Sequence, residues 1–67
     1  MSNSKEKFVN VYKEVFNQDG SIKPCGRKTT ICLIELANEL KPGIDFGSNE
    51  TGIMNVENIK TLHSELK

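Results

Sequence analysis

Three basic residues, Lys23, Arg27 and Lys28, come just before the most apolar segment of the chain, residues 31–40. The apolar segment has the spacing of a helix. A helix N-terminus carries unpaired N–H groups and about half a positive charge, to which nearby Arg and Lys side chains add. Lys23, Arg27 and Lys28 are therefore candidates to receive a phosphate or the carboxylate of a partner. The competing interpretation is that they are ordinary surface charges.

The same region is only superficially like a phosphate-binding loop. Five residues separate Gly20 from Gly26, and Arg27 stands between the second glycine and Lys28. A phosphate-binding loop needs four intervening residues and a lysine directly after the second glycine. It also needs a preceding strand, which the sequence does not predict. Nucleotide hydrolysis is not expected.

Cysteine, histidine and paired acidic residues do not predict a metal site or a catalytic centre. Cys25, Cys32 and His63 include no close pair, whereas structural zinc generally takes four ligands with one short spacing. Two helical turns would separate the cysteines by ~10 Å, so we expect free reduced thiols, with Cys32 in the core. Glu35 and Glu39 have the i, i+4 spacing of a solvated helix face. We expect a non-enzymatic protein with no cofactor.

Size and charge restrict the remaining classes of function. The 67 residues form one small domain, 1–67, which buries only ~60% of the surface of its unfolded chain. Nine basic and nine acidic residues cancel, and a net charge of zero disfavours nucleic acid as the partner. No apolar run has the length of a signal peptide or the ~20 residues of a membrane span. A cytoplasmic protein with no membrane partner is expected.

Apolar residues at three- and four-residue spacing predict a first amphipathic helix over residues 4–17. Asn3 is its expected N-cap, with Glu6 as the reciprocal partner in a capping box. Residues 1–3 are expected to be flexible. Asn, Asp and Gly residues then predict a turn, since they tolerate positive φ.

An aromatic row, Phe8, Tyr12 and Phe16, lies on one face of this predicted helix. Aromatic residues concentrate binding energy at protein interfaces. We therefore take Phe8, Tyr12 and Phe16 as the candidate interface. The alternative is that the same row belongs to the core of the domain.

The start of the second helix is left open by its sequence. Pro24 can be the first helical residue, or Gly26, Thr29 or Thr30 can cap a shorter helix. From residue 31 to residue 40 the apolar arc is broad, which predicts a central helix with neighbours on two sides.

The connection that follows, residues 44–52, holds two glycines together with Ile44 and Phe46. We expect a structured loop packed over the core, although long loops are also frequent functional sites. Asn55 is the expected cap of a third helix over residues 56–66.

The predicted fold is all-α: a small single domain of about three helices with a structured loop before the last helix. Its three amphipathic segments offer more apolar surface than a small core encloses. The leading hypothesis is thus an interaction or regulatory protein that forms a homodimer or binds another protein. The abundance of Asn, Lys and Ile is typical of proteins from AT-rich bacteria or their phages.

The alternative function is a compact helix-turn-helix-like module that binds nucleic acid, in which Arg27 and Lys28 contact phosphates. The zero net charge weighs against it. So does the long connection between the last two predicted helices, because the motif uses a turn of about three or four residues.

Overall fold

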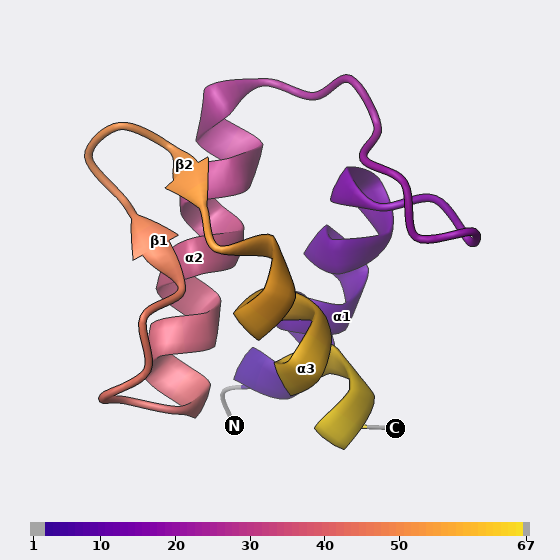
Figure 1. Cartoon of the computed structure of the whole chain (residues 1–67). Helices are drawn as coiled ribbons and strands as arrows, with labels where there is room; N and C mark the ends of the chain where they lie inside the picture. Colours follow the sequence, from indigo (N-terminus) through magenta and orange to yellow (C-terminus); the bar gives the residue numbers. More distant parts are fainter. Residues whose placement is uncertain (1–2, 67) are drawn as a thin grey trace.

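The computed structural model describes residues 3–66, which form three helices and one short β-hairpin. In chain order these elements are α1 (Ser4–Val15), α2 (Arg27–Leu40), β1 (Gly47–Ser48), β2 (Ile53–Met54) and α3 (Val56–Glu65). Helices α1 and α2 pack along each other, α3 crosses in front of them, and the hairpin lies against α2 (Figure 1). The helical prediction is confirmed, but the domain is not purely all-α.

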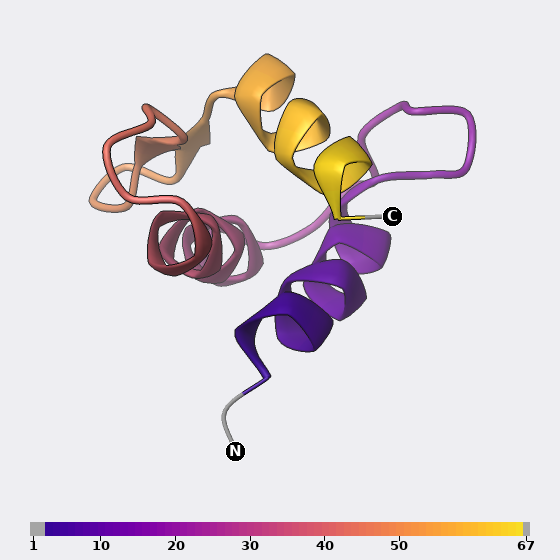
Figure 2. The same ribbon diagram turned by 90° about the horizontal axis from the view of Figure 1, so that it is seen from below.

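The apolar faces of the three helices meet in one core, which the view along α2 shows as the space between them (Figure 2). Its members are Phe8, Val15, Phe16, Leu33, Ile34, Leu36, Ala37, Phe46, Ile59 and Leu62. No polar or charged residue within residues 3–66 is buried with them. Helix α2 supplies four members of the core, which agrees with its predicted central position.

Helix α1 begins at the predicted residue, Ser4, but its N-cap bond and its end differ from the prediction. Asn3 is the N-cap, but its side chain caps no backbone N–H and instead donates from Nδ2 to Glu6 Oε2 at 2.9 Å. The helix ends at Val15, because Phe16 is extended and pairs with Ile22 in an isolated β-bridge. The predicted end at residue 17 is therefore wrong. The predicted flexibility of residues 1 and 2 lies outside the described residues.

Of the starts left open for the second helix, the structure selects the one capped by Gly26. The amides of Thr29 and Thr30 donate to the Gly26 carbonyl at 3.1 and 3.4 Å, so neither threonine is the cap. Cys25 and Cys32 are free and exposed, and the prediction that Cys32 lies in the core is wrong. Its position on the helix turns it away from the face that buries residues 33, 34, 36 and 37.

The predicted loop 44–52 contains most of the hairpin, whose antiparallel register pairs Gly47 with Met54 and Ser48 with Ile53. Phe46, just before β1, is 1% exposed and packs in the core, as expected of a structured loop, whereas Ile44 is 39% exposed and does not. The amide of Asn55 donates to the Phe46 carbonyl at 2.9 Å, which ties the hairpin to the start of α3.

The predicted cap of the last helix is confirmed, because the Asn55 side chain accepts from the Asn58 amide at 3.3 Å. Such a bond satisfies one of the amides that a helix N-terminus leaves unpaired. The cap therefore fixes where α3 begins, and with it the position of the side chains that α3 turns toward α1.

Candidate functional site

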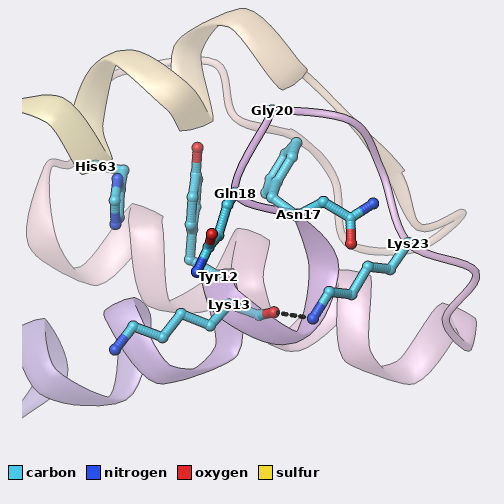
Figure 3. A pocket seen from close by; sticks show the side chains of 8 residues that line it. Tyr12, Lys13, Asn17, Gln18, Gly20, Lys23 and His63 are labelled. Atoms are coloured by element: carbon cyan, nitrogen blue, oxygen red, sulfur yellow. Dashed lines mark hydrogen bonds between the residues drawn. The ribbon is translucent and has the colours of Figure 1, made fainter.

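A hollow of about 590 Å³ lies beside the C-terminal end of α1, and we call it the aromatic hollow. Its wall combines α1, the loop after α1 and one residue of α3 (Figure 3). The residues that line it are Tyr12, Lys13, Phe16, Asn17, Gln18, Gly20, Lys23 and His63. Its volume is within the range of protein sites that hold a small molecule or a few side chains.

Three stacked rings form the apolar part of this wall. Tyr12 lies between His63 and Phe16, with its centroid 3.8 Å from the His63 ring at 4° and 4.5 Å from the Phe16 ring at 28° (Figure 3). The ammonium of Lys60 lies over the Phe16 ring, 5.6 Å from its centroid. Neighbouring groups thus cover the faces of Tyr12, and the rings of Tyr12 and His63 present their edges to the hollow.

Lys23 closes the C-terminal end of α1. Its amide donates to the Val15 carbonyl at 2.8 Å, and its Nζ donates to the Lys13 carbonyl at 2.9 Å (Figure 3). These carbonyls belong to the last turn, whose oxygens have no partner within the helix. The positive charge also lies at the negative end of the helix dipole. Lys23 therefore caps the C-terminal end of α1.

The loop that carries Lys23 is held in one shape by its own hydrogen bonds. The Asn17 amide donates to the Ser21 carbonyl at 2.8 Å, and the Gly20 amide donates to the Asn17 carbonyl at 3.0 Å. Asp19 Oδ1 accepts from the Ser21 hydroxyl at 2.7 Å and from its amide at 2.9 Å. These bonds, the hydroxyl first, lower the pKa of the Asp19 carboxyl. The hollow thus has a formed rim.

The three basic residues of the predicted anion site do not share the start of α2. Lys23 binds α1, while Arg27 is the first residue of α2 and lies against the hairpin. A Cβ added at Gly52 would lie 2.6 Å from Arg27 Cγ. Lys28 is exposed. The chain between α1 and α2 folds back on α1 and brings the Lys23 side chain to the end of that helix. The anion site stays a prediction.

The structure also divides the predicted aromatic interface. Phe8 is 0% exposed and Phe16 is 3% exposed, because α3 covers this face of α1, whereas Tyr12 is partly exposed. Burial raises the pKa of Tyr12, so its phenol is neutral at neutral pH. The interface stays a prediction, and Tyr12 is the member of the row that keeps exposed surface.

Sequence reasoning missed Lys13, Gln18 and His63 as residues of the site. Lys13 and Gln18 were indistinguishable from solvated positions at the end of a helix. His63 meets Tyr12 only because α3 crosses α1, and no spacing in the sequence signals this contact. A basic residue in the last turn of a helix was the available signal for Lys13.

The charges around the hollow are unbalanced. Lys13 and Lys23 line it, and no Asp or Glu does. Within residues 3–66 the ion pair is elsewhere, between Lys41 Nζ and Glu65 Oε1 at 2.7 Å. In the same part of the chain no three Cys, His, Asp or Glu side chains gather as metal ligands. None of the helices described is long and apolar enough to cross a membrane.

Replacing Lys23 by methionine is expected to lower the free energy of unfolding by about 0.5–1 kcal/mol, because the last turn of α1 loses a charged donor. Urea denaturation measures the change. Lys28→Met is the matched control, since Lys28 is exposed at the start of α2, and its effect should stay within about 0.5 kcal/mol. Equal losses in both variants would contradict the capping role of Lys23.

The aromatic hollow therefore offers a neutral phenol, ring edges and two ammonium groups on a rim held by hydrogen bonds. This chemistry suits recognition of a complementary surface. Comparison of the chain with protein-family models, with curated proteins and with solved structures finds no match.

Proposed function

We propose that the protein is a non-enzymatic interaction module that docks another protein at the aromatic hollow. The observation that supports this is Tyr12, a partly exposed ring that is stacked on both sides and lies in the wall of the hollow. Aromatic anchors at the centre of a hollow are the residues that most often dominate binding energy.

Preorganisation supports the same proposal. The stack holds the ring of Tyr12, and the bonds around Ser21 hold the loop at the rim, so binding has little side-chain or loop motion to restrict. Less ordering on association leaves more of the contact energy as affinity. A volume of about 590 Å³ takes a few side chains of a partner.

Binding of a different protein explains the surface better than an obligate homodimer does. The chain closes its own core, with ten buried apolar residues. The large apolar side chains that stay exposed, Ile22, Ile44 and Ile53, lie on three separate segments. An obligate dimer interface is expected to gather such residues into one patch. Light scattering after size exclusion tests for the dimer directly.

A blocking substitution tests the proposal. Gln18 is an exposed residue at the rim, so Gln18→Trp should fill the hollow and leave the fold intact. Immobilised chain would capture partners from cell extract, and each one purified would be titrated against wild type and variant. We expect the dissociation constant to rise at least tenfold, by about 1.4 kcal/mol or more.

Asn38→Trp is the matched control, because Asn38 is exposed on α2 and does not line the hollow. Its affinity should equal that of wild type. Partners that bind Gln18→Trp as tightly as wild type would overturn the proposal, and so would a dimer that persists in that variant while no other protein binds.

A further inference from the structure

The residues that line the aromatic hollow include two lysines and no carboxylate, and Asp19 in the rim loop binds Ser21. Lys23 donates its Nζ to the Lys13 carbonyl, which is a neutral group. Lys13 itself is exposed, and within the described chain its ammonium makes no ion pair. Two ammonium groups thus border the hollow, with no carboxylate among the residues that line it.

The aromatic part of the wall, like the ammonium groups, favours a negatively charged occupant. An aromatic ring is negative on its faces and positive at its edges. The faces of Tyr12 are covered by His63 and Phe16, and the edges of Tyr12 and His63 are turned to the hollow (Figure 3). The edge of Tyr12 and the ammonium groups therefore favour an occupant with negative charge.

We propose that the aromatic hollow binds an acidic peptide segment of a partner protein. Its carboxylates pair with Lys13 and Lys23, and an apolar side chain between them packs against the edge of Tyr12. The amide of Gln18 is placed at the rim to hydrogen-bond the peptide backbone. This inference rests on the proposed function and adds to it the chemistry of the partner.

The geometry favours a peptide over a nucleic acid. Proteins that bind single strands stack bases on free aromatic faces, and each stacked base contributes about 1–3 kcal/mol. Here Tyr12 has a ring on each side, and Phe16 both stacks on Tyr12 and has the ammonium of Lys60 over its ring. The net charge of zero also gives no general attraction to phosphates. A carboxylate needs only the ammonium groups and the edge of Tyr12.

Titration followed by NMR of the ¹⁵N-labelled chain tests this inference with three probes. They are the blocked peptide Glu-Glu-Glu-Leu-Glu-Glu-Glu, its counterpart with Gln at every Glu, and an oligothymidylate of equal charge. We expect the acidic peptide to shift the amides of residues 12–23 in a saturable way. The Gln peptide should bind at least about tenfold more weakly.

Two matched variants locate the charge effect. Lys13→Gln and Lys28→Gln each remove one exposed positive charge, the first at the hollow and the second at the start of α2. The dissociation constant of the acidic peptide should rise about 1.5- to fivefold in Lys13→Gln, the usual range for one exposed ion pair. It should be unchanged in Lys28→Gln.

Each other outcome overturns the inference. No shift at the hollow with the acidic peptide excludes it, and equal losses in both variants show non-specific attraction. If the Gln peptide binds as tightly as the Glu peptide, the partner does not need to be acidic, and the proposed docking function is not affected. Stronger shifts of the same amides with oligothymidylate would show that the hollow binds nucleic acid instead of an acidic peptide. The docking function itself fails separately, through Gln18→Trp.

Discussion

Replacing Gly47 by alanine should lower the free energy of unfolding by about 2–4 kcal/mol, a large part of the ~3–10 kcal/mol expected for a chain of this length. Gly47 has a φ of +119°, a conformation that residues with a Cβ rarely adopt. An added Cβ would also press on the Ile53 carbonyl oxygen and lie 2.8 Å from Met54 Cα and 2.9 Å from the Asn55 amide nitrogen.

All of these atoms are backbone, so no side-chain rotation relieves the contact. The strand pair must separate locally, which weakens the bond between the Asn55 amide and the Phe46 carbonyl. Loss of this tie affects the start of α3, and α3 carries His63 of the aromatic hollow. Urea denaturation followed by circular dichroism measures the change.

Two other glycines separate the causes of this effect. Gly43 has a φ of +91° but nothing within 4 Å of an added Cβ, so Gly43→Ala should show only the conformational effect of about 1 kcal/mol. Gly26 has neither constraint but is the N-cap of α2, where glycine is preferred to alanine, so Gly26→Ala should cost no more than about 1 kcal/mol. If Gly47→Ala is no worse than Gly43→Ala, the close approach of β1 and β2 is contradicted.

The three helices were predictable because their apolar residues recur at helical spacing, which needs only local sequence. The cap of α3 was predictable for the same reason, since Asn55 acts on an amide three residues away. The end of α1 was not, because Phe16 leaves the helix to pair with Ile22. That pairing depends on the path of the following loop.

The hairpin was missed because each of its strands has only two residues, too few for an alternating pattern. The sequence did contain a trace of it in Gly47 and Gly52. Both have positive φ in the structure, and both stand where another part of the chain approaches closely. Glycines at these positions indicated a tight connection without showing that it was a strand pair.

The candidate site was predictable in part. Tyr12 was named from the aromatic row, but the row alone does not show which of its rings α3 leaves exposed. Lys23 was named from its charge, yet its partner is the Lys13 carbonyl, which it reaches only after the loop turns back on α1. The residue types therefore identified two members of the site. Which groups these residues contact could be known only from the tertiary fold.

The aromatic row leads to the second large effect, since Phe16→Asp is expected to leave the chain unfolded. Phe16 is 3% exposed, and loss of its ring empties core volume at a cost of about 3–5 kcal/mol. The new carboxylate would also enter apolar surroundings, which adds a penalty of its own. The ammonium of Lys60, 5.6 Å from the ring centroid, does not restore the lost packing. Circular dichroism should show loss of the helices.

Gln18→Asp is the control, because it adds the same charge two residues further on at an exposed position. It should keep wild-type helicity and a denaturation midpoint close to that of wild type. A folded, soluble Phe16→Asp chain would contradict the core and restore Phe16 to the predicted interface. If Phe16→Asp unfolds, its failure to bind a partner does not show whether Phe16 contacts that partner. Partner binding must then be tested through the exposed rim, at Lys13 and Gln18, where substitution leaves the stacked rings in place.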